Sequence, residues 1–357
     1  MRVHDILWDI LRKRSRRHMS EQLGFEDFKD CIRIGFEEAF PNSDIHIQEI
    51  YKNNVTLTGV SVLTGEDGIS PTIYLEDYFE QMKVKNVSVS DMAEHVVDAY
   101  KALLEKKNIV IDVNANDFFN YDYVKDRILP RLVSIEANRS FLENKPYIKR
   151  ADLAEIFVIQ VAEIDGHYAT AYVTDLHAKK LGLSAEVMHK LAVNNQEKYG
   201  SVKIQGILTV IRDMMLKDMD ENDPFKELMM DEMMGDIETM NDNLVLMSNS
   251  FMIQGAACVV NDKYMEQLRD YMGTDELYII PSSVHEVLIA KADSNLDVDE
   301  LEEMIRSVNM EVSPEDRLSD NLYKYDFDRH ELYLAKDELS RTNIQNSTIT
   351  SNMHSAR

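Results

Sequence analysis

The polar residues that follow one apolar run are the side chains of this sequence best suited to catalysis. The run ELYIIPSSVHEVLIA contains Ser282, Ser283, His285 and Glu286. A catalytic serine needs a histidine base within hydrogen-bond distance and an acid that orients this histidine. Because neighbouring side chains of a strand point to opposite faces, His285 and Glu286 cannot form such a pair within a strand. We therefore predict that Pro281, Ser282 and Ser283 form a turn between extended segments, without a catalytic triad.

The same turn is also a candidate ligand site. Ser283, His285 and Glu286 could hold a polar ligand together with residues that are distant in the sequence. Four such companions carry suitable side chains: Asp152, His167, Asp175 and His177. Their distance from the turn depends on the fold, so a structural turn and a ligand site stay open as alternatives.

The common motifs of metal, nucleotide and hydrolase sites are missing from the sequence. It contains no Cys-x-x-Cys, His-Glu-x-x-His, Gly-x-Ser-x-Gly, Walker lysine loop or Gly-x-Gly-x-x-Gly. Two carboxylate-rich runs resemble calcium-binding loops, but Asp223 and Val298 stand where such loops need glycine. We therefore expect no metal site and no cofactor.

Charge and cysteine content restrict the partners and the compartment. The 357 residues include 64 Asp plus Glu against 39 Lys plus Arg, which gives a net charge of -25. Such an acidic chain repels nucleic acid phosphates and anionic membranes, so we expect no direct nucleic acid binding. Cys31 and Cys258 lie in apolar stretches, which predicts buried thiols and a cytoplasmic protein.

Short helical and alternating patterns predict an α+β fold with mostly antiparallel sheets and two lobes. Helical periodicity follows Phe25, the serines at 88 and 90, and Ser184; Ser88 or Ser90 and Ser184 are candidate N-caps. Alternating apolar segments flank the turn sequences KNN, DGH and DFDRH, which predict hairpins. Two strand–strand–helix units, near residues 156–198 and 277–310, resemble a degenerate repeat.

These patterns divide the chain into four parts. We expect a basic amphipathic extension at residues 1–22 and an α+β lobe at 23–110. A second α+β region follows at 111–336 and contains an acidic, methionine-rich insertion at 212–243. The polar, aperiodic residues 337–357 predict a disordered tail.

Two of these segments are candidate contacts with other molecules. An apolar helical stripe precedes a basic cluster in the extension, which suits a membrane surface or a partner. This cluster comprises Arg12, Lys13, Arg14, Arg16 and Arg17. Four methionines of the insertion can share one helix face and line a partner-binding groove. They are Met229, Met230, Met233 and Met234. The plainer interpretations are a helix packed on the body and an insertion folded against its own domain.

The segments ISPTIYL, RADLAEIFVI and LYIIPSSVHEVLIA occur in this order within a larger ordered set. The set resembles a family of uncharacterised bacterial proteins, classed as a domain of unknown function. The resemblance spans residues 25–336 and implies a bacterial cytoplasmic origin and an α+β fold. It implies no activity and no catalytic residues.

We therefore expect a non-enzymatic binding or adaptor protein whose partner is another protein. The missing catalytic motifs, the acidic surface and the methionine-rich segment favour this function. The first alternative is an enzyme, such as a hydrolase, with a polar site near residues 281–286. The second is an acidic decoy that imitates nucleic acid, which requires carboxylates clustered on one face.

Overall fold

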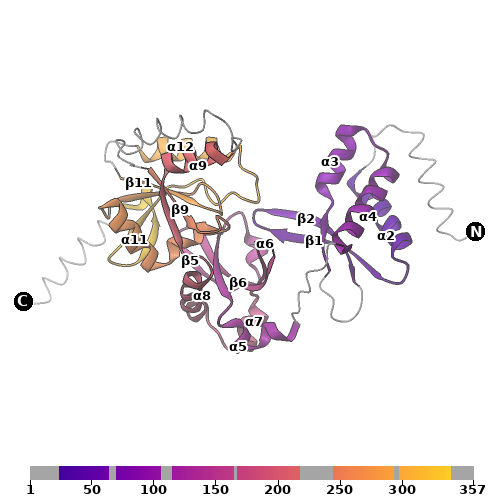
Figure 1. Ribbon diagram of the computed structural model, residues 1–357, viewed down its shortest axis with the longest axis horizontal. Coiled ribbons are helices and arrows are strands. Elements are labelled where there is room, and N and C mark those ends of the chain that lie inside the picture. The colour runs from indigo at the N-terminus through magenta and orange to yellow at the C-terminus, as the bar shows by residue number, and fades with distance from the viewer. Residues whose placement is uncertain are drawn as a thin grey trace, which may run out of the picture. The chain divides into compact units, whose positions relative to one another are not determined.

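Helices and antiparallel sheets alternate along the chain, which confirms the predicted α+β fold (Figure 1). The computed structural model describes residues 24–63, 70–105, 115–164, 167–217, 244–292 and 297–338. The chain divides into two compact units, Met1–Asn116 and Asp117–Arg357. In the described ranges, none of the helices has the length and hydropathy to cross a membrane. The tail from residue 339 and both candidate contact clusters lie outside the described residues: Arg12, Lys13, Arg14, Arg16, Arg17, Met229, Met230, Met233 and Met234.

The first unit packs its helices and a three-stranded antiparallel sheet around a single core. The strands, in sheet order, are β1 (Asp44–Lys52), β2 (Val55–Leu63) and β3 (Ile73–Tyr74). The helices are α2 (Phe25–Ala39), α3 (Glu76–Lys85) and α4 (Val89–Glu105). Ser88 Oγ accepts a hydrogen bond from Asp91 N at 3.2 Å, so Ser88 is the cap of the two predicted candidates, Ser88 and Ser90. Phe28, Phe36 and Tyr100 are fully buried in this core.

The second unit contains a four-stranded and a six-stranded antiparallel sheet. The first sheet has the order β4–β6–β5, and β7 pairs with β6; the strands are β4 (Ile128–Ser134), β5 (Tyr147–Arg150), β6 (Leu153–Ile164) and β7 (His167–Tyr172). The second has the order β13–β12–β10–β11–β9–β8. Its strands are β8 (Val202–Gly206), β9 (Leu244–Asn249), β10 (Leu277–Ile280), β11 (Val287–Lys291), β12 (Tyr323–Asp326) and β13 (Glu331–Leu334).

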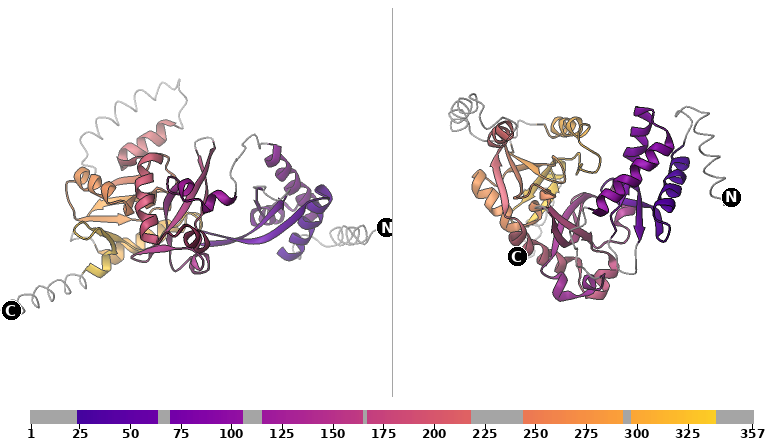
Figure 2. Two further views of the ribbon diagram at one scale, coloured as in Figure 1. Left: turned by 90° about the horizontal axis from the view of Figure 1, so that it is seen from below. Right: turned by 45° about the vertical axis from the view of Figure 1, so that its right-hand side comes forward.

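Helices cover both faces of the six-stranded sheet. The helical segments from residue 115 onward, not all of which pack on this sheet, are η2 (Ala115–Phe119), α5 (Tyr121–Val124), α6 (Arg139–Leu142), α7 (Asp175–Leu181), α8 (Ala185–Tyr199), α9 (Ile207–Lys217), η3 (Gly255–Val260), α11 (Asp262–Met272), α12 (Val298–Asn309) and η4 (Ala335–Asp337). Ile279 and Ile289 pack with η3 and α11, whereas Tyr278 packs with Ile305 of α12. This division follows from the alternation of side chains along a strand. Helices α9 and α12 lie over the same face (Figures 1 and 2).

The predicted hairpins and strand–strand–helix units have direct counterparts. Strands β6 and β7 pair and precede α7 and α8, and β10 and β11 pair and precede α12. The Ser184 hydroxyl accepts a hydrogen bond from Val187 N, so Ser184 caps α8 as predicted. These elements depend on local patterning, which explains why the sequence predicts them well.

Partly buried polar contacts connect the two sheets of the second unit. The Tyr323 hydroxyl on β12 donates to Asp152 Oδ1 at 2.7 Å, and Asn321 Nδ2 donates to Asp152 Oδ2 at 2.8 Å. Asp152 lies in the turn between β5 and β6, beside Ala151, which has a φ of 55°. Burial and the nearby Asp152 carboxylate both raise the pKa of Tyr323 well above its usual value. The tyrosine therefore stays protonated and can serve as the donor.

Candidate functional site

Residues 281–286 form the connection between β10 and β11. Ser283 Oγ donates to Glu286 Oε1 at 2.8 Å and accepts a hydrogen bond from His285 N at 2.9 Å. These two local bonds close a turn, as Pro281 and the serines predict. The expectation that His285 and Glu286 belong to an extended segment was wrong, because β11 begins only at Val287.

Both ring nitrogens of His285 have partners within the described chain. Nδ1 accepts a hydrogen bond from Gln254 N at 3.1 Å, and Nε2 lies 3.1 Å from Asp316 Oδ1. This pattern requires a neutral ring that carries its proton on Nε2 and donates it to Asp316. The ring therefore orients a loop, and the Ser283 hydroxyl points to Glu286 instead. Serine, histidine and acid do not line up as a triad here.

Three of the four proposed companions, Asp152, Asp175 and His177, make contacts of their own. Asp152 binds Tyr323 and Asn321, as described above. The His177 ring lies 2.9 Å from Thr174 Oγ1 at the start of α7. The Asp175 amide in the same turn donates to the carbonyl oxygen of Asn144. The side chain of His167 lies outside the described part of the chain.

Replacing Ser283 with alanine should destabilise the second unit by about 1 kcal/mol, because a buried hydroxyl that both donates and accepts is lost. Chemical denaturation measures this change. Ser282→Ala, at the partly exposed neighbouring position, is the matched control and should change stability by less than about 0.5 kcal/mol. Equal losses in both variants would contradict a specific role for the Ser283 hydroxyl.

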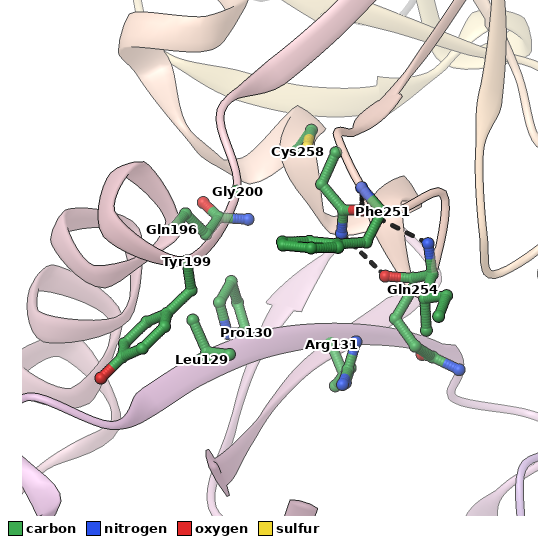
Figure 3. A pocket seen from close by; sticks show the side chains of 11 residues that line it. Leu129, Pro130, Arg131, Gln196, Tyr199, Gly200, Phe251, Gln254 and Cys258 are labelled. Atoms are coloured by element: carbon green, nitrogen blue, oxygen red, sulfur yellow. Dashed lines mark hydrogen bonds between the residues drawn. The ribbon is translucent and has the colours of Figure 1, made fainter. Parts of the chain in front are cut away.

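A small pocket lies beside the loop that His285 holds. Its walls come from β4, from the C-terminal end of α8, from the loop at residues 249–254 and from η3 (Figure 3). The cavity has a volume of about 50 Å³. Such a space suits a few water molecules or the head group of a small ligand.

Strained backbone and a close aromatic contact shape this pocket. Met252 and Gln254 have φ values of 56° and 55°, which are uncommon for residues other than glycine. Asn249 holds the strained loop, because its side chain accepts hydrogen bonds from Phe251 N and Ile253 N and donates one to Ile253 O. A Cβ atom at Gly200 would lie 3.0 Å from the Phe251 ring, so glycine permits the ring to approach α8.

Arg131 supplies the positive charge of the pocket. It is partly buried on β4, and burial lowers the pKa of its guanidinium to about 10, so the group remains charged at neutral pH. No carboxylate within the described ranges forms an ion pair with it. Cys258 lines the same pocket. Burial raises the pKa of its thiol to about 12, so the thiol is uncharged at neutral pH and contributes only apolar surface.

The sequence did not lead us to Arg131, although it contains a signal. A single arginine interrupts the apolar run ILPRLVS, and a lone charge in a buried strand needs a compensating environment. Hydrogen bonds at both ends of β4 join Arg127 O to Gln160 N and Ile135 N to Asp152 O. The backbone groups of the odd-numbered residues of β4 therefore form hydrogen bonds with β6. The backbone nitrogen of Pro130 faces the unpaired edge of β4, so its lack of an N–H removes no hydrogen bond from the sheet.

Apart from the pocket, the second unit exposes large apolar side chains on α9 and α12. Part of the predicted methionine-rich insertion, residues 212–217, is described, and it belongs to α9. We call the exposed apolar residues of these two helices and of the residue after α12 the methionine surface. They are Ile211, Met214, Met215, Met304, Val308 and Met310.

Comparison with known proteins places the chain in a family. Residues 25–327 match the family of unknown function DUF5688. Because this match covers most of the sequence, the chain belongs to that family, in agreement with the resemblance read from its motifs. No curated protein and no solved structure matches the chain.

Proposed function

We propose that this chain is a non-enzymatic binding or adaptor protein that captures a basic amphipathic helix of a partner protein. The observation that carries the proposal is the exposure of large apolar side chains on the methionine surface. Met214, Met304 and Met310 are 65%, 63% and 71% exposed. Flexible methionine side chains adapt to different partner residues at low cost.

The pattern along α12 supports this function. The helix buries Glu302, Ile305 and Asn309 toward the sheet, so its packing does not use Met304 or Val308. Those two residues are four positions apart and share one side of the helix. They form an apolar stripe that a partner helix can cover.

Charge selects the kind of partner. Four exposed carboxylates lie on α12 or directly after it: Asp299, Glu300, Glu303 and Glu311. Glu300 lies four positions before Met304 on α12, so it borders the stripe. A partner helix with an apolar face and flanking Lys or Arg residues complements both features, and the net charge of -25 assists its approach.

A labelled 18-residue peptide of leucine and lysine, with all leucines on one helical face, tests this function. We expect fluorescence anisotropy to show micromolar binding that weakens with added salt. The double variant Met304→Ser/Val308→Ser should bind at least about tenfold more weakly, because two apolar contacts are lost. Its melting temperature should stay within about 2 °C of the unaltered chain.

Leu176→Ser is the matched control for this experiment. Leu176 is 54% exposed on α7, where Lys179 and Lys180 follow it instead of carboxylates. This variant should bind the peptide like the unaltered chain. A peptide with glutamate in place of lysine should not bind. Unchanged affinity in the double variant, or equal affinity for both peptides, would overturn the proposed function.

A further inference from the structure

We infer that the pocket between β4, α8 and the 249–254 loop is a binding site for a small monocarboxylate with an apolar body. The site is separate from the methionine surface and involves different residues. It rests on three observations: the charge at Arg131, the hydrogen bonds of the loop and the apolar character of the walls.

The first observation is the cation. Arg131 lines the pocket, and among the described residues it forms no ion pair with a carboxylate. A desolvated guanidinium without a counter-ion costs free energy, whereas two parallel N–H···O bonds to a carboxylate compensate for the lost water. Gln254 lines the same pocket as Arg131 (Figure 3), so its side-chain amide can donate a further hydrogen bond to the carboxylate.

The second observation limits the charge of the ligand. The backbone amides of the loop already have acceptors: Phe251 N and Ile253 N bind Asn249 Oδ1, Gln254 N binds His285 Nδ1, and Gly255 N binds His285 O. A phosphate dianion usually needs several free amides or cations. One guanidinium with no spare amide suits a single negative charge, which is a carboxylate.

The third observation concerns the body of the ligand. Leu129, Pro130, Phe251 and Ile253 contribute apolar walls. The Phe251 ring extends across β4 toward Gly200 (Figure 3). The cavity of about 50 Å³ holds only the carboxylate head group, beside Arg131. The Phe251 ring is 38% exposed, so a flat apolar or aromatic body can pack against it at the open mouth of the pocket.

Benzoate is the probe, and isothermal titration of the full chain is the measurement. We expect saturable 1:1 binding with a Kd of about 1 mM or lower, as befits a ligand of this size. Benzamide, which has the same shape without the charge, and inorganic phosphate should bind at least about tenfold more weakly. If benzoate does not bind at about 20 mM, which is 20-fold above the expected Kd, the assignment is overturned. Equal affinity for benzamide and benzoate would also overturn it.

Arg131→Met separates a binding role from a structural one. This variant should lose at least about tenfold in benzoate affinity while its melting temperature stays equal or rises, because an unpaired desolvated charge has been removed. Arg139→Met, at an exposed position on α6, is the control and should bind benzoate normally. A lower melting temperature of Arg131→Met with unchanged benzoate affinity would assign Arg131 to structure and refute the site.

Discussion

Replacing Glu155 with glutamine should destabilise the second unit by about 3 kcal/mol, the largest loss that we expect from removing a single charge. The Glu155 side chain on β6 is completely buried. Its Oε2 lies 2.8 Å from Arg150 Nη2, and its Oε1 lies 2.7 Å from His189 Nδ1. Glutamine keeps the shape of the side chain but leaves the mostly buried guanidinium of Arg150 without its counter-charge. Thermal unfolding should show a fall of roughly 6–12 °C.

The matched control for this substitution is Glu197→Gln. Glu197 Oε2 lies 2.7 Å from Lys263 Nζ, but both side chains are largely exposed. Water screens this pair, so we expect a loss below about 1 kcal/mol. In a double variant, Arg150→Met with Glu155→Gln, the total loss should be smaller than the sum of the two single losses. If Glu155→Gln is as stable as Glu197→Gln, the buried cluster does not hold the sheet through its charges.

Gly255→Ala should destabilise the second unit by a similar amount, about 3 kcal/mol, through crowding. A Cβ atom at this position would lie 2.6 Å from Asn249 N and 2.7 Å from His285 O, and it would also collide with Ser248 Oγ. Two of these neighbours are backbone atoms, so the contact cannot be relieved by a side-chain rotation. The loop and the 281–286 turn must separate, and the Gly255 N to His285 O hydrogen bond is lost. Circular dichroism during urea unfolding measures the effect.

Gly182→Ala distinguishes crowding from backbone strain. Gly182 ends α7 with a φ of 66°, and no atom lies within 4 Å of the place where its Cβ would be. The substitution should therefore cost only about 1 kcal/mol, the usual penalty for a left-handed alanine. Equal losses at Gly255 and Gly182 would show that crowding at residue 255 is not the cause.

Much of the fold could be predicted because its signals are local. The caps at Ser88 and Ser184 satisfy free amides of their own helices, and a residue three positions away supplies the donor. The alternation of side chains along β10 and β11 is also a local signal, because it shows which residues lie on each face of the sheet. The extent of β11 was misjudged, because the Ser283 to Glu286 bond keeps the residues before Val287 in a turn.

The candidate sites were predictable only in part. The sequence drew attention to His285, but it left a structural turn and a ligand site open as alternatives there. The structure assigns the ring to Gln254 N and Asp316, residues 31 positions away on either side. The methionine-rich composition was visible in the sequence, whereas the exposure of Met304 and Met310 was not. Spacing defines which side chains share a helix face, but it does not say which face the sheet covers.

By itself, the sequence determined the α+β class, the hairpins, several of the helices, the acidic character and the family, because these follow from periodicity, composition and ordered motifs. Tertiary structure alone decided that Arg131 of β4 shares a pocket with Gly200 and with Phe251 of a later loop. It also decided that Glu155 is buried between Arg150 and His189. Such contacts depend on how segments distant in the sequence pack. A charged side chain needs a specific partner only when the surrounding chain buries it away from water, and the local sequence does not show that burial.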